Sequence, residues 1–179
     1  MDFNTVVKER RSIRKFDAEK KVTPEQIAEM VQAAIYAPSW KNAQTSRYYA
    51  CMSEGAMNQV KSGMPDFNNN SIKDASAVIV TTVVANRSGY ERDGSATTEF
   101  CHNEWGIYDL GMACQNLVLK AQDMGLGTLV MGIRDSEAVK TALGIPEDQI
   151  VVAVIGVGYP AVSPEMPKRK AVEDVLKVL

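Results

Sequence analysis

Histidine is almost missing from this sequence of 179 residues, in which His102 is the only example. Zinc enzymes and Ser-His-Asp hydrolases both depend on histidine side chains. The surrounding EFCHNEW segment also has no nucleophile elbow. The sequence therefore argues against a hydrolase and against a metal site, and we expect His102 to be an ordinary residue of a helix.

Cysteine is scarce as well, and Cys51, Cys101 and Cys114 are an odd number without metal-ligand spacing. In a reducing compartment we expect two or three of them to be small buried thiols. No apolar run approaches the roughly 20 residues of a membrane span, and the opening MDFNTVVKERR lacks the apolar stretch of a signal peptide. These features predict a cytoplasmic protein, and the length predicts one domain over residues 1–179.

A large excess of charge of one sign is also absent, because the formal net charge is only −2. The chain as a whole thus has no electrostatic reason to bind nucleic acid or an acidic membrane. Glycine-rich phosphate loops are missing too. GVGYP (156–160) has Tyr-Pro where a dinucleotide fingerprint needs its third glycine and a helix start, and no Walker motif occurs. A nicotinamide cofactor, if one is used, is not held in a Rossmann pocket.

Helix and strand signals alternate along the chain. Thr23-Pro24-Glu25-Gln26 has the form of a capping box and opens a helix that ends before Pro38. The β-branched runs at 75–85 and 149–158 predict central strands that helices cover on both faces. We further expect strands at 46–52 and 126–132 and helices at 97–124 and 135–143, with Gly125 and Gly144 ending the two helices.

The expected helix 97–124 is apolar nearly all round, and Gly106, Gly111 and Ala113 would let another backbone approach closely. A helix of this kind is either central to its domain or shared with a second subunit. The tail from Tyr159 carries three prolines and is expected to be extended, so that it can wrap a neighbour. Both features favour a dimer.

Two basic clusters lie near the opposite ends of the chain, KERRSIRKF (8–16) and KRK (168–170). From the residues alone, cations that complement a helix C-terminus and a solvated charge run are the favoured interpretations. Forked arginine donors around a serine hydroxyl would also suit an isolated phosphate. Similarly, APSWKNAQ (37–44) and the asparagines 68–70 are accounted for as turns or caps. The residues alone leave these alternatives open.

The four blocks RRSIRKF, APSWKNAQ, DLGMACQNLVLKAQDMGLGT and PKRK, in this order and spacing, resemble the FMN-dependent nitroreductase family from about Phe3 to Lys170. The resemblance implies an α+β fold, a three-layer α/β/α sandwich around a mixed, mostly antiparallel sheet. It also implies a homodimer with the long helix in the interface and FMN sites between the subunits. The implied donor is NADH or NADPH, and the implied acceptor is a nitroaromatic or a quinone.

The resemblance also implies which residues hold FMN. In the family the N-terminal block surrounds the phosphate, the late basic residues complete that site, and Arg14 lies towards N1 and O2 of the flavin. A loop of the other subunit reaches the ring, an asparagine bonds its pyrimidine edge, and a strand end lies along N5. Carried over, the site residues are Arg10, Arg11, Ser12, Arg14, Pro38, Ser39, Trp40, Asn42, Gln44, Asn68, Ser71, Val130, Met131, Gly132, Lys168 and Arg169.

Ser71 departs from the family pattern, because relatives often have a second basic residue near the flavin there. No catalytic side chain is expected, since the flavin itself accepts and donates hydride in two steps. Another flavin reaction, such as reductive dehalogenation or heterocycle oxidation, and a non-catalytic FMN-binding or storage protein stay open. The segment 86–100 is either a wall of the acceptor pocket or a plain surface loop.

Overall fold

The computed structural model describes residues 1–97 and 102–179, which form six α-helices, four β-strands and two short 3-10 turns in these ranges. The helices are α1 (Phe3–Glu9), α2 (Pro24–Ile35), α3 (Glu54–Ser62), α4 (Asp66–Ser71), α5 (Glu104–Asp123) and α6 (Ser136–Leu143). The strands are β1 (Ser46–Cys51), β2 (Ala77–Val84), β3 (Gly127–Met131) and β4 (Gln149–Gly158). The 3-10 turns are η1 (Trp40–Asn42) and η2 (Val172–Asp174).

The four strands form one sheet in the order β1-β2-β4-β3, and every neighbouring pair is antiparallel. The sheet was predicted to be mixed and mostly antiparallel. The mixed part of this prediction is wrong, because no two strands in the described ranges pair in parallel. Parallel pairing there is limited to an isolated bridge between Ser12 and Thr128 beside β3. Further along, the N-terminal segment forms an isolated antiparallel bridge between Phe16 and Pro160.

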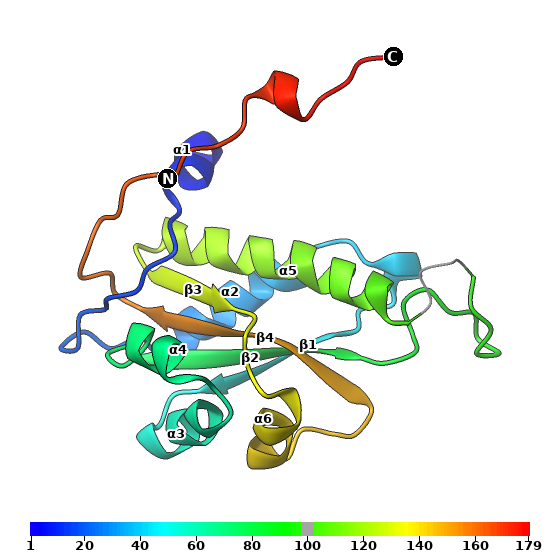
Figure 1. Ribbon diagram of the computed structural model, residues 1–179, viewed down its shortest axis with the longest axis horizontal. Helices are drawn as coiled ribbons and strands as arrows, with labels where there is room; N and C mark the ends of the chain where they lie inside the picture. Colours follow the sequence, from blue (N-terminus) through cyan, green and yellow to red (C-terminus); the bar gives the residue numbers. More distant parts are fainter. Residues whose placement is uncertain (98–101) are drawn as a thin grey trace.

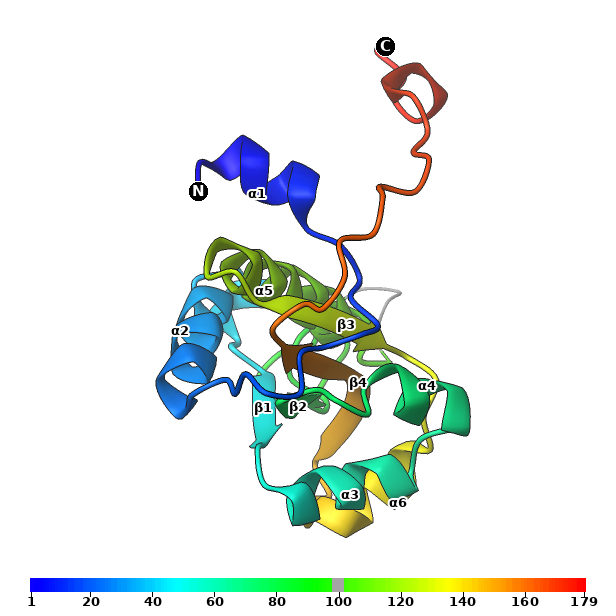
Figure 2. The same ribbon diagram turned by 90° about the vertical axis from the view of Figure 1, so that its left-hand side faces the viewer.

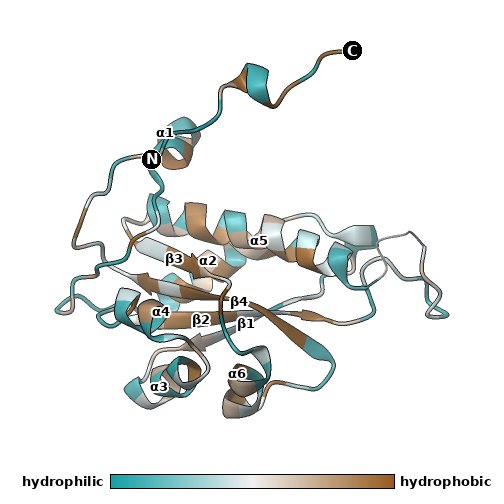
Figure 3. Cartoon of the chain, viewed as in Figure 1, coloured by the Kyte–Doolittle hydropathy of each residue, from teal (hydrophilic) through white to brown (hydrophobic). Residues whose placement is uncertain are grey.

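The sheet lies between two layers of helices. Figures 1 and 2 show α2 and α5 on one face and α3, α4 and α6 on the other. The hydropathy colouring of Figure 3 marks the two central strands, β2 and β4, as largely apolar. β2 is buried along nearly its whole length, as its unbroken β-branched sequence requires. The predicted three-layer α/β/α sandwich is therefore confirmed.

Local sequence signals account for several of these boundaries. Thr23 accepts a hydrogen bond from the amide of Gln26, and the Gln26 side chain accepts one from the amide of Thr23, which completes the predicted capping box. After α5 the chain leaves through Gly125 with φ 74°, and α6 ends at Gly144 with φ 61°. Glycine adopts these left-handed angles without steric penalty, so both predicted stops are confirmed.

The beginning of the long helix was predicted too early. α5 starts at Glu104, directly after Asn103 in a left-handed conformation with φ 75°, which interrupts any helix that comes from the N-terminal side. His102 is an exposed turn residue and not a helix residue. The stretch 98–101, including Cys101, lies outside the described residues. The helices α3 and α4 were not predicted, because their segments are polar and short.

The small residues of α5 do not share one face. Gly106 and Ala113 face the interior, where Gly106 lies against Val83 and Ser88. Gly111 is exposed, and a Cβ there would meet open space. Only Gly111 therefore remains available for close approach of another backbone. Within the described ranges, no helix combines the length and apolarity that crossing a bilayer requires.

α1 and the C-terminal tail lie outside the three layers. Figure 2 shows both on the far side of α5 from the sheet, with the tail projecting away from the body. Every residue from Pro160 to Leu179 is exposed, as expected for an extended tail, and five of the last eight are apolar: Val172, Val175, Leu176, Val178 and Leu179. Within the described residues of a single chain, nothing covers this apolar surface.

Candidate functional site

The N-terminal basic segment is fixed by its attachment to β3. Ile13 donates its amide hydrogen to the carbonyl oxygen of Thr128 at 2.9 Å, and its side chain is buried in the core. Gly127 makes room for that side chain, since a Cβ on Gly127 would lie 2.7 Å from Ile13 Cγ1. The segment from Arg10 to Ser12 is thereby held, half-buried, along the edge of the sheet.

The two basic clusters meet at this edge. The pKa of Arg10 lies below its ordinary value, first because the guanidinium is partly desolvated and then because Arg11 and Arg169 are close enough to repel it. Arg11 donates to the carbonyl oxygens of Lys8 and Arg10, and its buried Nε has no hydrogen-bond partner within the described ranges. Three arginines from both ends of the chain thus converge without a compensating carboxylate of the described part.

Lys168 and Arg14 are less constrained than these three arginines. Both are exposed. Arg14 Nη1 lies 3.5 Å from the carbonyl oxygen of Ser12, a distance at the limit of a hydrogen bond. Each side chain is therefore free to turn towards an anion bound beside the segment 10–12.

A second group of predicted residues gathers where α4 meets the end of β3. Asn68 is only 8% exposed and donates from Nδ2 to the carbonyl oxygen of Ile133 at 2.8 Å. Along β3 the exposed Val130 precedes the buried Met131, and the exposed Gly132 follows with open space where a Cβ would lie. Ser71 instead donates to the carbonyl oxygen of Phe67 within its own helix at 2.8 Å. The Asn68 amide and the 130–132 backbone therefore form one small surface.

The loop 38–44 forms the third group, around an unusual backbone. Lys41, Asn42 and Gln44 all have positive φ, at 43°, 56° and 50°. Ser39 Oγ accepts a hydrogen bond from the Gln44 amide at 3.0 Å, which closes the loop on itself. Backbone strain of this kind persists only where surrounding contacts enforce it.

The enforcing contacts come from α5. Asp109 is 3% exposed, and its Oδ2 accepts from the Trp40 amide at 3.0 Å and from Ser88 Oγ at 2.7 Å. The Trp40 ring packs against Trp105 one turn earlier, with ring centroids 4.9 Å apart. Sequence reasoning did not include Asp109. A usable signal existed, because it is the one carboxylate between Glu104 and Asp123 and lies in the mostly apolar first half of the helix.

Beside Trp40 lies a cavity of about 580 Å³. The loop 38–44 forms one wall, and a small hairpin that follows β2 forms the other. The lining residues are Trp40, Lys41, Asn42, Ala43, Asn86, Arg87, Tyr90, Glu91, Arg92 and Gly94. The described part of the segment 86–100 thus forms a cavity wall. That this cavity takes the acceptor stays a prediction.

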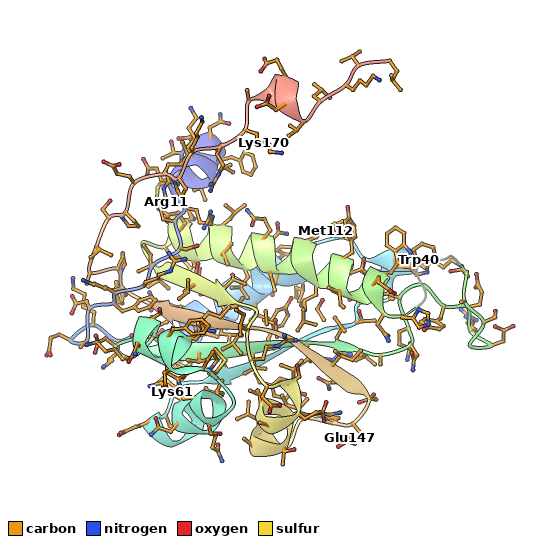
Figure 4. The ribbon with its side chains drawn as sticks, in the orientation of Figure 1. Arg11, Trp40, Lys61, Met112, Glu147 and Lys170 are labelled. Carbon is orange, nitrogen blue, oxygen red and sulfur yellow. The ribbon has the colours of Figure 1, made fainter. Side chains whose placement is uncertain are left out.

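The predicted site residues do not come together within one chain. The arginine cluster is near the C-terminal end of α5, where the N-terminal amine pairs with Asp123. The loop 38–44 lies at the N-terminal end of α5, on Trp105. Figure 4 shows Arg11 and Trp40 towards the two opposite ends of this helix. No cluster of three or more metal-ligating side chains occurs in the described ranges.

Comparisons of the sequence with known proteins identify a family and relatives that match most of the chain. The model of the Nitroreductase family matches residues 7–159. A proposed NADH dehydrogenase/NAD(P)H nitroreductase of Archaeoglobus fulgidus is 28% identical over 155 residues, which cover 84% of this chain and 81% of that protein.

Two solved structures are similar in fold over nearly their whole length. A proposed nitroreductase of Exiguobacterium sibiricum in complex with FMN has a TM-score of 0.88 and 21% identity, covering 100% of this chain and 98% of its own. A proposed NAD(P)H:FMN oxidoreductase of Staphylococcus epidermidis has a TM-score of 0.87 and 22% identity, covering 99% of this chain and 96% of its own. The resemblance seen in the sequence is confirmed, and this chain belongs to the Nitroreductase family.

Proposed function

We propose that this protein is an FMN-dependent oxidoreductase that uses NAD(P)H to reduce an electron-poor acceptor, a nitroaromatic or a quinone. The whole chain, residues 1–179, forms one FMN-binding unit in this proposal. The observation that carries it is the convergence of Arg10 and Arg11 with Arg169 from the other end of the chain. Membership of the Nitroreductase family and the FMN complex of a structural neighbour support the choice of ligand.

The residues at the sheet edge fit the phosphate of FMN. The pKa of Arg10 is lowered first by partial desolvation and then by repulsion from Arg11 and Arg169, and a phosphate dianion would oppose both effects. It would also offer an acceptor to Arg11 Nε, which has no hydrogen-bond partner in the described ranges. Ser12 adds a short neutral donor, and Lys168 is close in sequence to Arg169. The open space at Gly132 and the exposed Val130 leave room for a flat ring beside the Asn68 amide. The donors present therefore match the group in charge and number.

When bound, FMN would supply the hydride chemistry at its N5 atom. The chain's own residues bind and orient it in this proposal. The arginine cluster holds the phosphate, the Asn68 amide faces the pyrimidine edge, and the 130–132 backbone lies along the N5 side. Arg14 places a cation near N1 and O2, where negative charge grows on reduction. With Ser71 in place of a second basic residue, Arg14 is the only cation proposed there.

The proposed assembly is a homodimer that completes each FMN site. The outer face of α5 carries exposed Ile107 and Tyr108, and beside it lies an open groove of about 490 Å³ that Met112 and Gly111 help to line. The exposed apolar tail would cover part of the partner subunit. Pro38, Ser39, Trp40, Asn42 and Gln44 would then reach the flavin held by the arginine cluster of the other chain.

An absorption spectrum of the purified protein tests the cofactor. We expect a yellow protein, or uptake of one FMN per chain on titration, and oxidation of NADH or NADPH that depends on an added nitroarene or quinone. Flavin bound without any turnover would leave only a storage protein. A colourless protein that FMN does not stabilise thermally would refute the whole proposal.

Complementation between two defective variants tests the shared site. Arg10→Ala damages the phosphate side of the site, and Asp109→Ala damages the side that holds Trp40. In a mixed dimer one site carries both defects and the other carries neither. Random reassociation of equal amounts makes half of the dimers mixed, so about a quarter of the unmutated activity should return. Recovery of no activity after verified subunit exchange would contradict a site built from two chains.

A further inference from the structure

The cavity beside Trp40 is strongly cationic for a protein of net charge −2. Lys41, Arg87 and Arg92 line it, against the single carboxylate of Glu91. Glu91 is already paired with Lys41, whose Nζ lies 2.5 Å from Oε1. Among the described residues neither Arg87 nor Arg92 has an ion-pair partner. Arg87 and Arg92 therefore border this space without an ion-pair partner in the described part of the chain.

The hairpin that carries these arginines is anchored at its base. The Asn86 amide donates to Asn103 Oδ1 at 2.6 Å, and Ser88 Oγ donates to the buried Asp109. Arg87 lies between these two anchored residues. Towards the tip, the Glu91 amide donates to the carbonyl oxygen of Ser95 at 2.8 Å, which forms the turn that carries Arg92. The backbone positions of Arg87 and Arg92 are consequently set by hydrogen bonds of their neighbours.

Aromatic rings complete the lining. Trp40 and Tyr90 both border the cavity and are half-buried. Flat rings beside guanidinium groups are the chemistry that binds nucleotides, because a base or a nicotinamide stacks on the ring while arginines contact phosphate oxygens. A neutral nitroarene or quinone would use the rings but would leave the arginines without a partner. The combination favours a phosphate-bearing ligand.

We propose that this cavity binds the phosphate-bearing part of the nicotinamide dinucleotide, with Arg87 and Arg92 as the residues that recognise its negative charge. This inference rests on the proposed function, in which Trp40 and Asn42 border the flavin as well as the cavity. The electron donor then enters over the loop 38–44, and its phosphates lie against the hairpin. The neutral acceptor makes no use of the two arginines.

The test compares charged and uncharged donors in the FMN-loaded dimer. NADPH and NADH carry phosphates, whereas 1-benzyl-1,4-dihydronicotinamide carries none and still donates hydride. Arg87→Ala and Arg92→Ala should each raise the saturation constant for NADPH and NADH by about three- to tenfold, between the effects of a screened surface ion pair and a charged hydrogen bond. The constant for the benzyl donor should stay within twofold. FMN affinity should not change.

A substitution that removes a negative charge from the cavity tests the same proposal independently. Glu91→Gln releases Lys41 and removes the one carboxylate, so the saturation constant for NADPH should fall, with the largest decrease at low ionic strength. Lys61→Ala on α3, across the sheet from the cavity (Figure 4), is the control and should change nothing.

Equal effects of the arginine substitutions on all three donors, or no effect on any, would overturn the inference and leave the proposed function intact. Failure of the unmutated protein to oxidise even the benzyl donor would instead refute the proposed function. The two failures are therefore distinguishable.

Discussion

The buried carboxylate of Asp109 is expected to be the strongest single support of the loop 38–44. Asp109→Ala removes the acceptor of two hydrogen bonds, from the Trp40 amide and from Ser88 Oγ. Each buried donor left unpaired costs about 1–3 kcal/mol. A neighbouring cavity of about 140 Å³, which Asp109 also lines, can admit water and offset part of this cost. We therefore expect the FMN-free protein to lose about 2–4 kcal/mol in its free energy of unfolding.

Urea unfolding of three variants measures this loss and separates its cause. Both hydrogen bonds end on the same oxygen, Oδ2, so the amide oxygen of Asp109→Asn can accept both. That variant should lose less than about 1.5 kcal/mol, because it keeps the bonds and gives up only the charge. Asp148→Ala removes an exposed carboxylate and should stay within about 0.5 kcal/mol of the unmutated protein. The reasoning is refuted if Asp109→Asn and Asp109→Ala are equally unstable, or if neither differs from the exposed control.

Three further outcomes are expected. Gly127→Ala should destabilise the protein by about 1–2 kcal/mol, because its Cβ would meet a buried isoleucine side chain, whereas Gly55→Ala, with nothing within 4 Å, should be neutral or slightly stabilising in the same urea assay. Burial raises the pKa of the Cys114 thiol to about 11. Between about pH 9 and 11 the thiol therefore loses its proton in the unfolded chain but keeps it in the folded protein, so the free energy of unfolding should fall as pH rises. Over this range the urea midpoint of Cys114→Ala should fall less steeply than that of the unmutated protein. Arg169→Ala should weaken FMN binding by roughly 1.5–3 kcal/mol in a fluorescence titration. Arg14→Ala should instead lower the reduction potential of bound flavin in potentiometry. Equal potentials in the Arg14→Ala and unmutated proteins would contradict the role given to Arg14.

The parts of the fold that sequence reasoning predicted well are those that local physics determines. The capping box at Thr23 and the glycine stops after α5 and α6 need no knowledge of the rest of the chain. The β-branched runs of β2 and β4 identify strands covered on both faces for the same reason. The strand order and the purely antiparallel pairing could not be predicted this way, because they depend on contacts between segments far apart in sequence.

In the candidate site, too, local sequence predicted individual residues but not the contacts between distant parts of the chain. From the residues alone, both basic clusters were interpreted as ordinary surface charge. Only the family resemblance placed Arg10 and Arg169 in one phosphate site. Their proximity is a property of the folded chain, since Ile13 must first dock on β3 and the tail must return past α1. Asp109 was overlooked for a related reason: a lone carboxylate in an apolar helix signals a buried partner but does not say which one. The identity of that partner, the Trp40 amide, follows only from the fold.

The distance along α5 is the structural reason for proposing that a second chain completes the site. Trp105 and Asp123 are 18 residues apart, which corresponds to about 27 Å of helix. No loop movement brings Trp40 to the arginine cluster across that distance unless α5 itself unfolds. A two-fold axis through the middle of the helix, near the exposed Gly111, would instead place two copies of α5 antiparallel to each other. In such a dimer the Trp40 end of one chain would meet the arginine end of its partner, and the same rotation would form the second site.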